Sequence, residues 1–171
     1  MIDPAIHTLI AIGLAVLFGT AAVHKVRSPA MFVATLADYR LLPPQLSSAA
    51  AVLLIALEFA LAAGLLWPAT RGLGGIVGAS LLLVYAAAIA INLRRGRRHL
   101  DCGCTLQHRP IGGWMVARNS VLAAAALLLV IPMSSRTIQS TDVATIVAAL
   151  CVIVLLYAAA DLLLARAGER G

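Results

Sequence analysis

Two cysteines separated by a single glycine, Cys102-Gly103-Cys104, are the residues of this sequence best suited to chemistry. A disulfide between them requires Cα atoms about 4.4–6.8 Å apart, and an extended Cys-x-Cys unit lies at or beyond the top of that range. Gly103 permits the necessary bend because it has no Cβ. So tight a bridge is strained, and strained, exposed disulfides are redox-labile. Because the neighbouring arginines and His99 favour the thiolate, we expect Cys102 and Cys104 to carry out thiol–disulfide exchange.

Two other interpretations of the same segment stay open. His99, Cys102, Cys104 and His108 form a compact cluster of side chains that zinc or copper accepts as ligands, in a spacing that matches no common zinc motif. Alternatively, the two cysteines are inert loop thiols. The third cysteine, Cys151, lies among apolar residues, where a cysteine usually packs as a small hydrophobic side chain.

The composition indicates the kind of element that must position these residues. The chain is 62% hydrophobic and only 12% charged, whereas soluble domains are about half apolar and a quarter charged. Runs of about 20 apolar residues are typical of membrane-spanning helices. Five such runs are present: Ala5–Val23, Leu46–Trp67, Leu73–Leu93, Trp114–Ile131 and Val143–Ala165. The intervals between them are too short for a second domain, so we expect residues 1–171 to form one helical bundle.

The first run and the segment after it have distinct roles in this prediction. The first run lacks the positively charged start of a signal peptide, so we expect it to be a retained helix. Between residues 27 and 45, Met31, Phe32, Val33 and Leu36 recur at helical spacing before Pro43-Pro44. This pattern predicts a short amphipathic helix at the membrane surface.

The positive charges predict an orientation in the cell membrane. The segments between the first and second spans and between the third and fourth spans share one side with the C-terminal tail. That side holds ten cations, Lys25, Arg27, Arg40, Arg94, Arg95, Arg97, Arg98, Arg109, Arg166 and Arg170, against Arg71 and Arg136 opposite. The positive-inside rule therefore places the N-terminus outside and the C-terminus in the cytoplasm. Since no groove-reading motif accompanies the charges, we expect anionic lipid as their partner and no nucleic acid.

Ionisable and amide side chains inside the spans are candidates for function, because they are costly there. Glu58 lies about 18 Å into its helix, and alone it would retain its proton. It is either a structural hydrogen-bonding acid or a proton carrier. Arg118 and Asn119 lie within the fourth run, and Lys25 and Asn92 at helix ends on the same side. We expect Arg118 to pair with Asp161 or Glu58, and Lys25 and Arg118 to stabilise a thiolate or an anionic ligand.

Small residues predict where helices approach closely in a bilayer. Ala56, Ala60 and Gly64 recur every four residues in the second run, and Gly74 and Gly78 form a Gly-x-x-x-Gly pair in the third. We expect these two stripes to meet across the turn at residues 68–72.

Several segments together resemble the methylamine-utilisation MauE-type membrane proteins, relatives of the DoxX-like family. The segments that carry the resemblance are His24-Lys25, Phe32, Tyr39-Arg40-Leu41-Leu42-Pro43, Glu58, Arg95-Gly96, Asp101-Cys102-Gly103-Cys104 and Arg118-Asn119. The family usually continues the Cys-Gly-Cys with an aromatic residue and glycine, whereas Thr105-Leu106 follows here.

The resemblance implies a role in disulfide handling, with a thioredoxin-like partner, during maturation of exported enzymes. Its most distant kinship, with quinone-coupled disulfide-forming membrane proteins, implies a quinone as cofactor. We therefore expect an all-α integral membrane protein that acts as a thiol–disulfide oxidoreductase through Cys102 and Cys104. The alternative is a non-catalytic subunit, or a small-molecule- or metal-binding protein, of a membrane complex.

Overall fold

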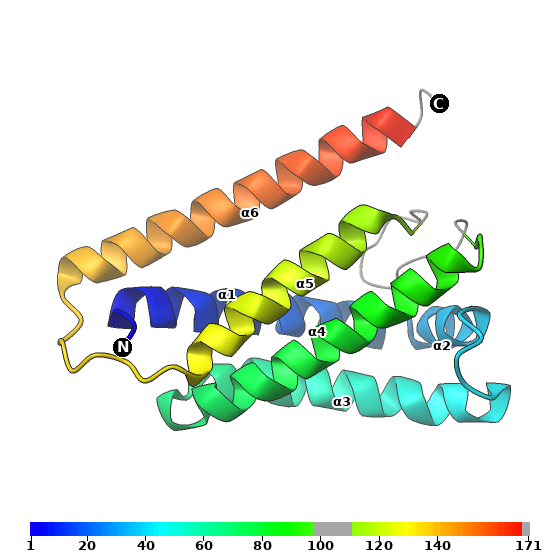
Figure 1. Cartoon of the computed structure of the whole chain (residues 1–171), viewed down its shortest axis with the longest axis horizontal. Coiled ribbons are helices and arrows are strands. Elements are labelled where there is room, and N and C mark those ends of the chain that lie inside the picture. The colour runs from blue at the N-terminus through cyan, green and yellow to red at the C-terminus, as the bar shows by residue number, and fades with distance from the viewer. Residues whose placement is uncertain (98–110, 169–171) are drawn as a thin grey trace. The chain divides into compact units, whose positions relative to one another are not determined.

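The computed structural model describes residues 1–97 and 111–168. The described residues are helical except for turns, the irregular segment before the last helix and one isolated parallel bridge between Ile2 and Met133, which confirms the all-α prediction. The α-helices of the described residues, labelled in Figure 1, are α1 (Pro4–Arg27), α2 (Pro29–Asp38), α3 (Ser47–Leu66), α4 (Arg71–Arg94), α5 (Gly113–Leu127) and α6 (Ser140–Gly168). Short 3-10 turns precede α3 and α4 and follow α5.

Four helices are long and apolar enough to cross a membrane, and they coincide with the first four predicted runs. With their flanking 3-10 turns they cover Pro4–Arg27, Pro44–Leu66, Pro68–Arg94 and Gly113–Val130. The 24 residues of α1 extend over about 36 Å at 1.5 Å per residue, more than the roughly 30 Å hydrocarbon core of a bilayer. The predicted fifth run lies within α6, whose apolar described part is Ser140–Leu156.

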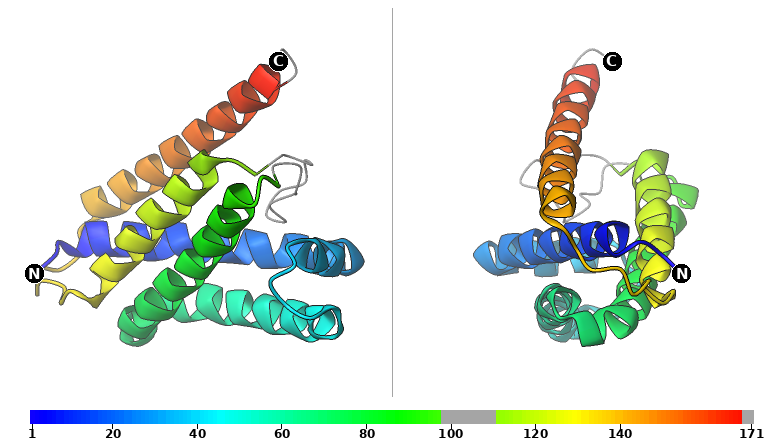
Figure 2. Two further views of the ribbon diagram at one scale, coloured as in Figure 1. Left: turned by 45° about the vertical axis from the view of Figure 1, so that its right-hand side comes forward. Right: turned by 90° about the vertical axis from the view of Figure 1, so that its left-hand side faces the viewer.

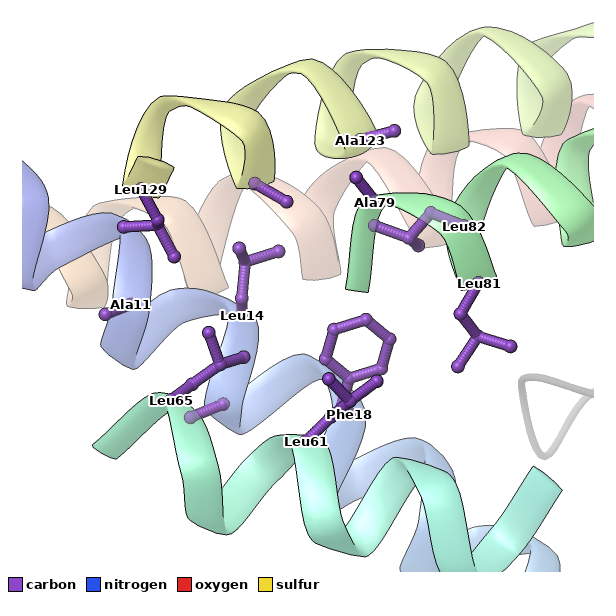
Figure 3. Close-up of a cluster of buried hydrophobic side chains, with 12 residues drawn as sticks. Ala11, Leu14, Phe18, Leu61, Leu65, Ala79, Leu81, Leu82, Ala123 and Leu129 are labelled. Carbon is purple, nitrogen blue, oxygen red and sulfur yellow. The ribbon is translucent and has the colours of Figure 1, made fainter. Parts of the chain in front are cut away.

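The chain divides into two compact units, one of residues 1–9 and 132–171 and the other of residues 10–131. In the second unit, α4 and α5 lie side by side in both views of Figure 2. The core of this unit contains Phe18 from α1, Leu61 and Leu65 from α3, and Ala79 and Ala126 from α4 and α5. Figure 3 shows Phe18 and Leu61 within this cluster. The cluster packs α1, α3, α4 and α5 against one another.

The prediction that small residues of α3 and α4 meet is wrong. The close approach of α4 at a glycine is to α5 instead. Ala56 and Ala60 are exposed, because the face of α3 that carries Leu61 and Leu65 is turned inward. Leu65 packs against Gly74, where an added Cβ would lie 3.0 Å from its side chain. The closest approach is between α4 and α5: a Cβ on Gly75 would lie 2.5 Å from the carbonyl oxygen of Ala126.

Gly75→Ala is therefore expected to destabilise the protein by at least about 1–3 kcal/mol, the usual cost of overpacking, because a backbone carbonyl cannot swing aside as a side chain can. Gly19→Ala is the matched control: it also adds a methyl group within a helix, but the nearest atom, Ala62 Cβ, is 3.7 Å away. Thermal unfolding in detergent would measure both variants. Equal melting temperatures for the two variants would contradict the close contact between α4 and α5.

The predicted short helix after the first span is confirmed as α2. Pro29 lies at its first turn, where a missing N–H costs little, and Phe32 is buried while Met31 is exposed. Arg40 follows the helix with a positive φ of 48°, which reverses the chain. The carbonyl of Arg40 accepts a hydrogen bond of 3.4 Å from Arg95 Nη1. The turn after α2 is thereby connected to the end of α4.

An ion-pair network joins the N-terminus to the segment before α6 within the first unit. Arg136 Nη2 lies 3.0 Å from Asp3 Oδ1, and its Nη1 lies 2.9 Å from Asp142 Oδ2. Hydrogen bonds from Arg136 lower the pKa of each carboxyl group. The stabilisation from these groups is thus present above their ordinary pKa near 3.8 and is lost as the pH falls through the lowered values. The contact therefore holds the N-terminus beside residues 136–142 within this unit.

Candidate functional site

A buried ion pair between Lys25 and Glu58 is the centre of the candidate site. Lys25 lies in the last turn of α1, and Glu58 lies near the middle of α3. Lys25 Nζ donates a hydrogen bond to Glu58 Oε1, and both side chains are about 1% exposed. Because two isolated charges would each lose much hydration energy here, the pairing offsets part of that cost. The pair couples the end of the first span to the interior of the second.

Two aromatic side chains complete the surroundings of the ammonium group. Lys25 Nζ lies 5.1 Å from the centre of the Phe32 ring and 5.2 Å from that of Tyr85. Both distances are within the range of a cation–π interaction. Tyr85, on α4, also donates its hydroxyl hydrogen to Glu58 Oε1 over 2.7 Å. Four helices, α1 to α4, therefore each contribute one side chain to this site, which we call the Lys25–Glu58–Tyr85 cluster.

The two oxygens of the Glu58 carboxyl group have different surroundings. Oε1 accepts from both Lys25 and Tyr85, whereas Oε2 has no hydrogen-bond partner among the described residues. Glu58 as a whole is 0% exposed. A buried acceptor without a partner is unusual in native proteins and calls for a chemical or structural reason.

Further buried polar side chains lie toward the ends of α4 and α5 that flank the cysteine segment. Asn92 is 0% exposed and donates from Nδ2 to the carbonyl of Ala88 over 3.1 Å. Its Oδ1 has no hydrogen-bond partner among the described residues. On α5, Asn119 is buried, and its Oδ1 accepts a hydrogen bond of 3.4 Å from Arg118 Nη2. Both amide side chains that the sequence singled out on these helices, Asn92 and Asn119, are thus buried.

One predicted pairing is wrong, and one member of the cluster was not predicted. The partner of Glu58 is Lys25, not Arg118, because the end of α1 lies beside the middle of α3. The side chain of Asp161, the other suggested partner of Arg118, is outside the described residues. Tyr85 was missed. The available signal was its hydroxyl group in an apolar run, since a buried Tyr O–H usually has a hydrogen-bond partner.

Of the three cysteines, the structure describes Cys151 and not Cys102 or Cys104. Cys102 and Cys104, with His99 and His108, lie outside the described residues, so thiol exchange and metal binding both stay predictions. Their segment connects the end of α4 with the start of α5. Cys151 lies within α6 and its side chain is exposed; its packing as a small apolar side chain stays a prediction.

Comparison with known proteins identifies relatives whose similarity extends over nearly the whole chain. The sequence profile described as "Methylamine utilisation protein MauE" matches residues 3–132. Proteins named methylamine utilization protein MauE from Methylophilus methylotrophus and Paracoccus denitrificans are each 36% identical, over 94% and 95% of this chain and 87% and 89% of their own lengths. The protein of that name from Paracoccus versutus is 40% identical over 94% of this chain and 88% of its own. No solved structure gives a significant match. The profile and these relatives together show that the chain belongs to the MauE family of membrane proteins.

Proposed function

We propose that this chain is a membrane thiol–disulfide redox protein in which Cys102 and Cys104 exchange a disulfide with a thioredoxin-like partner during maturation of exported proteins. The observation that carries the proposal is the place of the Cys-Gly-Cys segment in the chain. It joins α4 and α5, and buried Asn92 and Asn119, with Arg118 beside the latter, lie toward the adjoining ends of these helices. Such a concentration of intramembrane polar groups favours a functional site over simple packing.

The exchange is chemically balanced without a further oxidant. One thiolate of the pair attacks a sulfur of the partner's disulfide, which forms a mixed disulfide and releases a partner thiolate. The second cysteine then attacks the mixed disulfide, so this chain ends with a Cys102–Cys104 disulfide and the partner with two thiols. In the reverse direction the partner is oxidised. A cation beside a cysteine favours the thiolate that begins each step, and we propose Arg118 for this role.

The family name supports the broader biological setting. The relatives are named for methylamine utilisation, and we propose that the exported proteins served by this chain include one that acts in that process. The buried contacts of the Lys25–Glu58–Tyr85 cluster would give helices α1 to α4 a fixed arrangement.

Thiol and metal measurements on the purified protein test this function against the metal-binding alternative. We expect two thiols, those of Cys102 and Cys104, to become reactive only after reduction, in a preparation without bound metal. Cys151→Ser removes the third thiol and keeps the count unambiguous. Stoichiometric zinc or copper that is lost on His99→Ala or His108→Ala would overturn the redox function.

The side of the membrane on which exchange occurs follows from the orientation. We propose an outside N-terminus and a cytoplasmic C-terminus in the cell membrane, because ten cations lie on one side. Both cations of the opposite side are engaged: Arg136 with two carboxylates, and buried Arg71 with the carbonyl of Leu65. Neither is a free charge that would oppose the unequal distribution of cations between the two sides.

Reporter fusions at the two ends are expected to show a C-terminal reporter active in the cytoplasm. In that orientation the cysteine segment connects two spans on the cytoplasmic side. To serve exported proteins, either the segment is reached from the other face of the membrane or electrons pass across the membrane. A C-terminal reporter active only outside the cell would contradict the orientation and place the cysteines directly on the exported side.

A further inference from the structure

The asymmetry of the Glu58 carboxyl group is the starting observation. Both hydrogen bonds that the structure gives to it, from Lys25 Nζ and Tyr85 Oη, reach the same oxygen, Oε1. Oε2 is buried with no hydrogen-bond partner among the described residues. The lone pairs of Oε2 are thus available in an interior where an unpaired acceptor is costly.

We propose that Glu58 is a proton-exchange site that takes up its proton on Oε2. In this step one O–H bond forms on Oε2, the C–Oε1 bond becomes the carbonyl, and Lys25 keeps its ammonium charge. The cluster passes from a neutral ion pair to a net charge of one. The inference rests on the proposed function in one respect: the proton that leaves an attacking thiol, and returns to a leaving thiolate, is the proton exchanged here.

The surroundings favour this site for the proton over the other groups of the cluster. The Phe32 and Tyr85 rings lie within cation–π distance of Lys25 and stabilise its ammonium form. A proton shift from Lys25 to Glu58 would lose that interaction, whereas uptake of an additional proton on Oε2 preserves it. The titratable groups that contact Glu58 are Lys25 of α1 and Tyr85 of α4. No other charged side chain in the described ranges hydrogen-bonds or ion-pairs with it.

The sequence makes this group unusually accessible to infrared spectroscopy. Glu58 and Glu169 are the only glutamates in the chain, so isotopically labelled glutamate reports on two carboxyl groups alone. Glu169→Gln leaves Glu58 as the single labelled group. The full-length protein, in lipid vesicles, would be examined over a range of pH and in its oxidised and reduced states.

We expect a labelled carboxylic-acid C=O band that persists in Glu169→Gln, is lost in Glu58→Gln, and differs in size between the oxidised and reduced protein. Tyr85→Phe, made in the Glu169→Gln background, should move the band to higher frequency, since the carbonyl oxygen Oε1 loses one of its two donors. This variant keeps the ring over Lys25 and is informative even if Glu58→Gln fails to fold.

Three results would overturn the inference: no labelled acid band in Glu169→Gln, a band that Tyr85→Phe does not move, or a band that is the same in both redox states. Thiol titration of the same samples distinguishes a failure of the proton-exchange site from a failure of the proposed redox function. Exchanging cysteines without the band would reject only the proton site. The band in a protein whose cysteines never form a disulfide would reject the redox function, and with it the source of the proton.

Discussion

Replacing either Cys102 or Cys104 by serine is expected to abolish thiol–disulfide exchange completely. One sulfur must attack the partner's disulfide and the other must resolve the mixed disulfide, so neither cysteine can act alone over a full cycle. A single-cysteine variant should instead accumulate a mixed disulfide with the partner. Non-reducing electrophoresis of membranes from cells that express each variant would measure both the loss and the trapped species.

Two variants serve as controls for this prediction. His108→Ala should keep most of the exchange activity, because a histidine that is not a ligand leaves both sulfurs in place. Cys151→Ser should keep all of it, since Cys151 is an exposed side chain of α6. Equal losses in His99→Ala, His108→Ala and the two cysteine variants would indicate a metal site, because each missing ligand opens the coordination shell.

Lys25→Met is expected to lower the free energy of unfolding by about 3–5 kcal/mol, the cost of leaving one member of a buried ion pair without its partner. Methionine is close to lysine in length and keeps an apolar side chain beside the Phe32 and Tyr85 rings, so the loss reports on charge more than on packing. Glu58, 0% exposed, then keeps only the hydrogen bond from Tyr85, and it must either stay an unpaired buried charge or take up a proton, each of which costs stability. Unfolding in mixed detergent, followed by the fluorescence of the two tryptophans, would measure the change.

The double variant Lys25→Met/Glu58→Gln should recover much of this stability, because it removes both charges together. A double-mutant cycle with the single variants isolates the coupling between the two side chains. Arg27→Met is the matched control, since it removes an exposed cation from the same end of α1 and should change stability by no more than about 0.5 kcal/mol. If Lys25→Met is no more harmful than Arg27→Met, the ion pair does not hold the site together.

The sequence was sufficient to predict the helices because their signal is local. Each span is a continuous apolar run that ends in proline, glycine or charge, and a bilayer demands such runs whatever their neighbours are. Four of the five predicted spans therefore coincide with the four helices long and apolar enough to cross a membrane in the described part of the chain. The short α2 was predictable for the same reason, from the spacing of Phe32 and its apolar neighbours.

The sequence also indicated which polar residues needed an explanation, since Lys25, Glu58, Asn92 and Asn119 stand out within apolar surroundings. All four are buried in the structure. Such residues are conspicuous because a polar side chain within a membrane span carries a burial cost. Both the residue type and its position in an apolar run can be read from the sequence.

The partners of these residues were decided only by the tertiary structure. Lys25 and Glu58 are separated by 33 positions, and Glu58 and Tyr85 by 27, and no periodicity within one helix relates positions so far apart. Their contact depends on how α1, α3 and α4 are rotated about their axes. The same rotation turns Ala56 and Ala60 outward and brings Gly75 against the backbone of Ala126, because the packing of Leu61, Leu65 and Phe18 determines which face of each helix is buried.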